Sequence, residues 1–165
     1  MTTDLTPVIA ASTRWLLTAF PPPAGALNRA LAEAQALQAT TLAAALAYPT
    51  DLDAELLHLL APSGSRRLDQ VTGSDPHPDD AAWRTWVDET IVSWAACLLA
   101  DPALATHAGT TAPDRTGDPR RLTRPGTHDH QAAALLRHPD FLEGIAGLHR
   151  PRLLELLNVE SAGLR

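Results

Sequence analysis

Residues 79–100, DDAAWRTWVDETIVSWAACLLA, are the stretch of sequence that decides the predicted fold. At about 100° per residue, the large apolar side chains fall on one arc of roughly 140°, a wide core-facing helix stripe. This stripe consists of Trp83, Trp86, Val87, Thr90, Ile91, Trp94, Cys97 and Leu98. The back of the second half is apolar too, and it consists of Val92, Ala95, Ala96 and Leu99. A helix that is apolar all round is buried on two sides, either by its own chain or by a partner.

The composition favours an all-α protein around this central helix. The chain has 165 residues, which is most simply one domain over residues 1–165 that buries roughly two-thirds of its unfolded surface. Hydrophobic residues make up 45% of the chain and aromatic residues only 4%, so the core must consist mainly of leucine and alanine. Both are strong helix formers. The single cysteine, Cys97, excludes an internal disulfide and is predicted to be an inert buried thiol.

Proline, glycine and capping residues divide the rest of the chain into further helices. We predict an irregular bundle of about five to seven helices, packed around the central helix at 79–100. The other predicted helical segments are 7–20, 24–47, 51–61, 128–137, 139–148 and 152–159, with one further turn at 103–107.

Two of these segments carry leucine stripes that are predicted to face the core. In 24–47 the stripe includes Leu27, Leu31 and Leu37, while alanines line the opposite side and allow a second helix to approach. Gln38 lies within this stripe, either as a long side chain that reaches a backbone partner or as a polar specificity point in a helix–helix seam. Segment 51–61 opens with the spacing of a capping box. Its inward stripe is predicted to be Leu52, Leu56, Leu59 and Leu60.

Three stretches lack a periodic apolar pattern. Residues 62–78 form a predicted linker rich in Pro, Gly and Ser, with one possible turn at 66–71. Residues 108–126 form a predicted long irregular loop, flexible and rich in arginine, and loops of this length are usually functional or mobile. The tail at 160–165 is predicted to be frayed.

The charge pattern excludes several functions. The formal net charge is −6, and all 13 basic residues are arginine. An acidic chain disfavours binding to nucleic acid, and the absence of lysine excludes Schiff-base chemistry and a phosphate-loop lysine. The first residues lack the basic start of a signal peptide, and no apolar run approaches the roughly 20 residues that span a membrane. We therefore expect a cytoplasmic protein without a membrane segment.

One cluster has the residue types of a metal site but an unsuitable spacing. It consists of His128, Asp129, His130, His138 and Asp140. On a helix, His128 and His130 point about 160° apart, and His130 and His138 lie about 12 Å apart along the axis. We therefore predict no metal, no cofactor and no catalytic residue.

Two groups of side chains are candidates for binding a partner protein. On the long loop, Arg120, Arg121 and Arg124 could order on an acidic protein patch, such as residues 51–55 or 75–80 of another copy of the chain. Trp83 and Trp86 stand one turn apart and either pack in the core or form a partner-binding patch. The apolar back of the central helix and the leucine-rich last helix add Val92, Leu99, Leu153 and Leu157.

The sequence thus predicts a non-catalytic cytoplasmic interaction protein, such as a small subunit, adaptor or regulator. It would act through helix packing with itself or with a partner protein. The alternative is a helical enzyme, or a small-ligand or metal-binding protein, with an inter-helix site near His128–Asp140.

Overall fold

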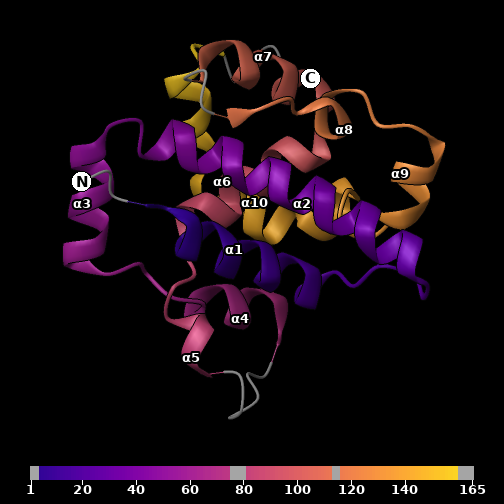
Figure 1. Ribbon diagram of the computed structural model, residues 1–165, viewed down its shortest axis with the longest axis horizontal. Coiled ribbons are helices and arrows are strands. Elements are labelled where there is room, and N and C mark those ends of the chain that lie inside the picture. The colour runs from indigo at the N-terminus through magenta and orange to yellow at the C-terminus, as the bar shows by residue number, and fades with distance from the viewer. Residues whose placement is uncertain (1–3, 75–80, 113–115, 160–165) are drawn as a thin grey trace.

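The computed structural model describes residues 4–74, 81–112 and 116–159, and within these ranges it contains ten α-helices and no strand (Figure 1). The prediction of an all-α fold is confirmed, although the described residues form more helices than expected. The helices are α1 (Thr6–Ala19), α2 (Ala26–Ala47), α3 (Asp51–Leu60), α4 (Arg66–Thr72), α5 (Ala81–Arg84), α6 (Glu89–Ala100), α7 (Pro102–Thr111), α8 (Arg120–Thr123), α9 (Thr127–Ala132) and α10 (Pro139–Leu156). No helix among the described residues is long and apolar enough to cross a membrane.

Helix α6 lies at the centre of the molecule, where it packs against both α2 and α10 (Figure 1). Every side chain from Ile91 to Leu99 is buried. The apolar back of the helix, from Val92 to Leu99, is as inaccessible as its front. The expected burial on two sides is therefore confirmed, and the chain itself provides both covers.

The prediction of a single helix over 79–100 is wrong, because residues 85–88 separate α5 from α6. Asp88 has an extended backbone (φ −110°, ψ 120°) and caps α6, since its Oδ1 accepts a hydrogen bond from the Ile91 amide at 3.0 Å. Its Oδ2 accepts a second hydrogen bond, at 2.7 Å, from the Tyr48 hydroxyl. Because Asp88 caps the helix and also bonds to Tyr48, its side chain favours a new helix start at this position over a continuous helix. Residues 79–80 lie outside the described residues.

A seam of side-chain to backbone hydrogen bonds joins α6 to α10. Ser93 Oγ donates to the Ala146 carbonyl at 3.1 Å and accepts from the His149 amide at 3.0 Å. Trp94 Nε1 donates to the His149 carbonyl at 2.9 Å. The two helices predicted at 139–148 and 152–159 are in fact one, since Pro151 lies inside α10. Proline removes one backbone donor from a helix, so this seam supports α10 next to its weakest turn.

Helix α2 packs mainly with the face opposite to the predicted one, although Leu42 and Leu46, at the C-terminal end of the predicted stripe, are buried as expected. Its alanine side, including Ala36 and Ala39, is completely buried, whereas Leu27 and Leu37 are exposed. Small side chains allow the α2 backbone to approach its neighbours closely, which leaves Leu27 and Leu37 outside. Gln38 reaches a backbone partner as expected, because its Oε1 accepts a hydrogen bond from the Leu122 amide at 3.1 Å.

The segments predicted to be irregular contain more helix than expected. The possible turn at 66–71 is helix α4, which buries Leu68. The long loop predicted over 108–126 is wrong for the described residues, because α7 continues to Thr111 and α8 spans Arg120–Thr123. Leu122 of α8 is fully buried and anchors this segment. Residues 75–78, 113–115 and 160–165 lie outside the described part of the chain.

A pair of leucine truncations tests this division between core and surface. Leu98→Ala removes a fully buried side chain of α6, and we expect it to lower the free energy of unfolding by about 3 kcal/mol. Leu59→Ala makes the same chemical change at a side chain that is 81% exposed, and we expect a change within about 0.5 kcal/mol. Urea denaturation followed by circular dichroism measures both values. Equal losses would contradict the assignment of α6 to the core.

Candidate partner-docking surface

Helix α3 is a well-capped helix at the edge of the molecule. Thr50 Oγ1 accepts a hydrogen bond from the Asp53 amide at 3.1 Å, and Asp53 Oδ2 accepts one from the Thr50 amide at 3.1 Å. This is the capping box that the sequence predicts. Only Ala54 and Leu57 of α3 are buried. In Figure 1 the helix stands at the left edge of the view, opposite α9 at the right edge.

The prediction that the leucine stripe of α3 faces the core is wrong. The stripe points outward, and its exposed fractions are 64% for Leu52, 46% for Leu56, 81% for Leu59 and 78% for Leu60. These positions are i, i+4, i+7 and i+8, so they lie on one face of the helix. We call these four residues the α3 leucine face. Scattered exposed leucines are ordinary on protein surfaces, whereas a contiguous apolar face marks an interaction site.

Carboxylates border the α3 leucine face. Asp51 and Glu55 are exposed and follow one edge of it, and Asp53 lies at the other edge. The ten residues of α3 contain no arginine. A partner of this face should therefore present apolar side chains flanked by positive charge.

Trp86 lies beside α3 and is the only one of the nine predicted site residues with a large apolar side chain on the surface. It is 40% exposed, and its ring centroid lies 5.9 Å from that of His58, in an edge-on arrangement. The His58 Nε2 atom also lies 2.8 Å from the carbonyl oxygen of Asp4. His58 therefore links α3 to the segment between α5 and α6.

Comparisons with protein-family models, curated proteins and solved structures find no match to this chain. A function must therefore be inferred from the surfaces and polar clusters of the chain itself.

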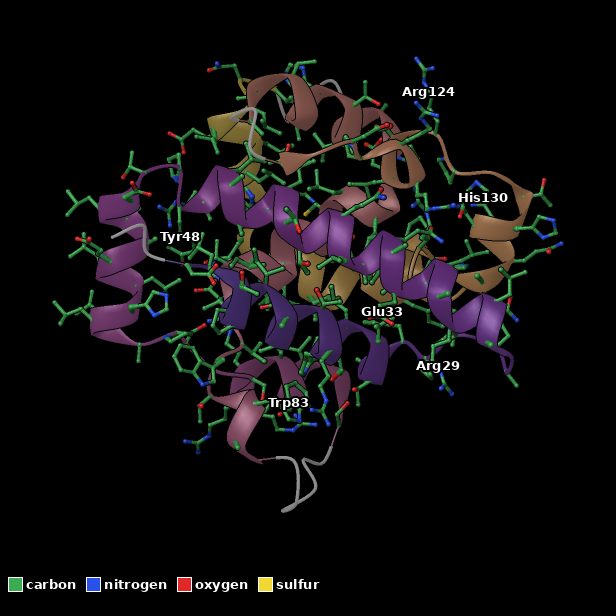
Figure 2. All side chains as sticks on the ribbon, in the orientation of Figure 1. Arg29, Glu33, Tyr48, Trp83, Arg124 and His130 are labelled. Carbon is green, nitrogen blue, oxygen red and sulfur yellow. The ribbon has the colours of Figure 1, made fainter. Side chains whose placement is uncertain are left out.

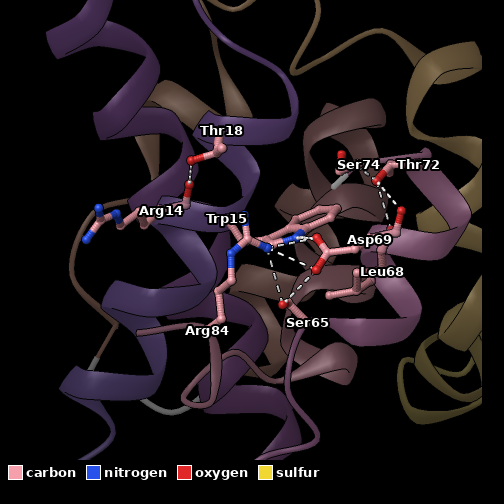
Figure 3. Close-up of polar contacts among 9 residues, drawn as sticks. All are labelled: Arg14, Trp15, Thr18, Ser65, Leu68, Asp69, Thr72, Ser74 and Arg84. Atoms are coloured by element: carbon pink, nitrogen blue, oxygen red, sulfur yellow. Dashed lines mark hydrogen bonds and ion pairs between the residues drawn. The ribbon is translucent and has the colours of Figure 1, made fainter. Parts of the chain in front are cut away.

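A buried ion pair holds α4 and α5 against α1. Asp69 accepts hydrogen bonds from Trp15 Nε1 at 2.9 Å, from Ser65 Oγ at 3.0 Å and from the Arg84 guanidinium at 2.9 and 3.0 Å (Figure 3). The Asp69 side chain is 7% exposed and that of Arg84 is 11% exposed. The carboxylate therefore has several donors around it and no room for a substrate, which indicates a structural role.

Trp83 belongs to this structural cluster. Its ring lies between two guanidinium groups, with Arg14 Cζ at 4.7 Å and Arg84 Cζ at 4.9 Å from the ring centroid. The ring is partly buried and packs against the core. Of the two roles that the sequence left open for Trp83, the structure supports core packing and the positioning of Arg14.

Four of the predicted partner-binding residues lie inside the folded chain. Val92 and Leu99 of α6 are covered, and so are Leu153 and Leu157 at the end of α10. They belong to the same hydrophobic core. A partner could reach these four side chains only if the chain opened.

The three arginines that the sequence predicted to bind a partner lie in α8 or directly after it. Arg121 pairs with Asp129 at 2.9 Å, and Arg120 lies 3.4 Å from Asp118. Arg124 is exposed at the end of α8, and Figure 2 shows it at the top right of the molecule. The only leucine of this helix, Leu122, points into the core. This surface is charged but offers no apolar side chain of α8 to a partner.

The predicted histidine and aspartate cluster does not converge in the structure. Asp129 is buried, where it accepts from the Gly126 amide at 2.9 Å and pairs with Arg121. His138 caps α10, and its ring lies 4.6 Å from that of Phe141. His130 is exposed on α9 (Figure 2). Among the described residues, no three His, Cys, Asp or Glu side chains are placed to hold a metal ion.

The structure adds a buried arginine that the sequence did not single out. The Arg137 guanidinium donates to Gln35 Oε1 at 3.1 Å and to the backbone carbonyls of Leu122 at 3.1 Å and Arg121 at 3.3 Å. Burial lowers the pKa of Arg137. Gln35 Nε2 in turn donates to the Asp129 carbonyl at 2.9 Å. This network fixes α8 and α9 against α2, and it has no sequence signature because its partners lie far apart in the chain.

Two further polar groups of α6 are engaged in structural contacts. His149 Nε2 lies 2.7 Å from Glu89 Oε1, but Ser93 Oγ is buried and bonds only to backbone groups of α10. Serine, histidine and glutamate are therefore close together without the serine–imidazole contact that nucleophilic catalysis requires. Cys97 is buried as predicted, and its burial raises the pKa of the thiol to about 11.

Removal of the Asp69 carboxylate tests the structural role of its cluster. Asp69→Ala leaves the buried Arg84 guanidinium and Trp15 Nε1 without their acceptor, and we expect a loss of about 3 kcal/mol in the free energy of unfolding. Asp118→Ala removes an exposed partner of Arg120 and should have little effect. Denaturant titration of both variants measures the difference. If Asp69→Ala were as stable as the parent chain, the ion pair would not be what holds α4 and α5.

Proposed function

We propose that this chain is a non-catalytic interaction protein, a small subunit, adaptor or regulator, that docks through the α3 leucine face. Its partner is a second copy of the chain or another protein. The observation that carries the proposal is the outward orientation of four leucines at docking-helix spacing on a helix that contributes only two buried side chains to the fold.

The energetics of the α3 leucine face support docking. Full burial of one leucine side chain is worth about 1.5–3 kcal/mol, and the chain leaves most of four such side chains in water. Helices that dock in grooves use anchors at i, i+4 and i+7, which are the positions of Leu52, Leu56 and Leu59. The acidic border then adds orientation and partner selectivity more than affinity.

Trp86 is a second exposed apolar side chain beside α3, on the side of the helix that bears His58 and apart from the α3 leucine face. Its half-exposed indole lies next to α3 through His58. Tryptophan is enriched among the residues that dominate binding energy at interfaces. We therefore include Trp86 in the docking surface, on the side of α3 that bears His58.

A polar double substitution on α3 tests the proposal. Leu56→Ser combined with Leu59→Ser removes two exposed anchors, and we expect the chain to fold normally but to lose association with itself or with its captured partner by at least about ten-fold in Kd. Circular dichroism checks the fold, and sedimentation equilibrium or a binding titration measures the association.

The matched control is Leu156→Ser, because Leu156 of α10 is exposed to nearly the same extent, at 44%, as Leu56. This control should associate like the parent chain. A parent chain that is monomeric at all concentrations and binds no protein, or an α3 double variant that associates like the parent, would refute the proposed function.

A further inference from the structure

An apolar groove runs between α1 and α2 on the outside of the molecule. It has a volume of about 460 Å³. Its walls include Ala10, Arg14 and Leu17 from α1 and Arg29, Glu33 and Leu37 from α2. Figure 2 shows Arg29 and Glu33 along the edge of α2 that faces α1. Leu37, which the sequence predicted to be buried, therefore lies in one wall of an open groove.

The groove and the α3 leucine face agree in length. Along α2, Arg29, Glu33 and Leu37 are spaced four residues apart, so this wall is about 12 Å long. The α3 leucine face spans eight residue steps from Leu52 to Leu60, which is also about 12 Å. A helix lying in the groove would place its anchors over the full length of this wall.

The charges of the two surfaces are complementary. Arg14 and Arg29 both line the groove, and Arg14 Cζ lies 4.7 Å from the centroid of the Trp83 ring. The α3 leucine face is bordered by Asp51 and Glu55. Because Arg29 lies at one end of the α2 wall and Leu37 at the other, the acidic start of α3 should lie toward Arg29 and its Leu60 end toward Leu37.

Two other docking arrangements are disfavoured by charge and shape. A symmetric contact between two α3 helices would place Asp51, Asp53 and Glu55 of each copy against a helix that has no arginine to pair with them. The arginines around α8 have the right charge, but Leu122 is buried and Arg121 already pairs with Asp129. Neither arrangement offers an apolar groove with a positive border.

From this match we infer that the α3 leucine face of one copy occupies the α1–α2 groove of a second copy. The inference rests on the proposed function and names the partner as the chain itself. The two surfaces differ, so the contact is head-to-tail, and such contacts continue into rings or open chains. Each copy would use one α3 and one groove.

A charge exchange tests which surfaces meet. Arg29→Glu and Glu55→Arg should each weaken self-association by about ten-fold, because each places like charges across the contact. The chain that carries both substitutions should regain most of the parent affinity. Arg124→Glu is the control, since this exposed arginine lies beside α8 and away from the groove, and it should have no effect.

A mixing experiment tests the head-to-tail geometry. Leu56→Asp removes the α3 leucine face and Leu37→Asp removes the groove, at two leucines that are both 46% exposed. Each variant alone should be monomeric by sedimentation velocity. Mixed in equal amounts, they should form a dimer and nothing larger, because one intact α3 and one intact groove are left.

The outcomes separate the inference from the proposed function. Loss of association in Leu56→Asp but not in Leu37→Asp or Arg29→Glu would overturn the groove as the site and leave docking through α3 intact. Loss in Arg124→Glu in place of Arg29→Glu would assign the acceptor to the α8 arginines and overturn it as well. If neither leucine variant changes the association state, both the inference and the proposed function fail.

Discussion

The burial of α6 on every side is the constraint on which the rest of the structure depends. Nine consecutive side chains, from Ile91 to Leu99, are removed from water, so the chain must cover both faces of this helix. Helices α2 and α10 do so, and both are long enough to cover all of α6. The hydrogen bonds from Ser93 and Trp94 to the α10 backbone then fix how far α10 is turned about its own axis. Apolar packing supplies the stability, and this polar seam supplies the register.

This arrangement determines which apolar surfaces are left outside. Since α2 approaches α6 mainly with its alanine face, Leu37 of α2 is left exposed in a wall of the α1–α2 groove. Since α3 contributes only Ala54 and Leu57 to the buried residues, its other leucines are exposed as well. The Trp83 ring contacts Arg84 of the buried ion pair and also Arg14, which is a lining residue of the groove. The core and the proposed docking surfaces are thus consequences of the same packing.

Sequence patterns predicted the helical class, the apolar pattern and the helix cap well, but they predicted poorly which face of a helix is buried. The all-α class, the apolar circumference of α6 and the capping box of α3 all follow from local chemistry. The predictions of which faces of α2 and α3 point inward were wrong, because periodicity shows that an apolar stripe exists but not whether other residues cover it. In α2 the close approach permitted by alanine decided the orientation.

The polar contacts were harder to predict. The break before α6 depends on Tyr48, which lies 40 residues from Asp88 and stabilises its carboxylate. The networks of Asp69 and Arg137 join residues that are distant in sequence, so residue spacing carries no signal for them. Of the residues that the sequence predicted to bind a partner, only Trp86 lies in the proposed docking surface. The α3 leucines were predicted to be buried, because an exposed leucine stripe and a buried one have the same spacing.

The central claim is that α6 is fully used inside the chain whereas α3 is kept for docking, and amide hydrogen exchange measured at low and high chain concentration tests it most directly. The account predicts that α6 amides are strongly protected at every concentration, while α3 and the facing edges of α1 and α2 gain protection as the concentration rises. Exchange in α3 that is independent of concentration, or α6 protection that appears only in the associated state, would contradict it.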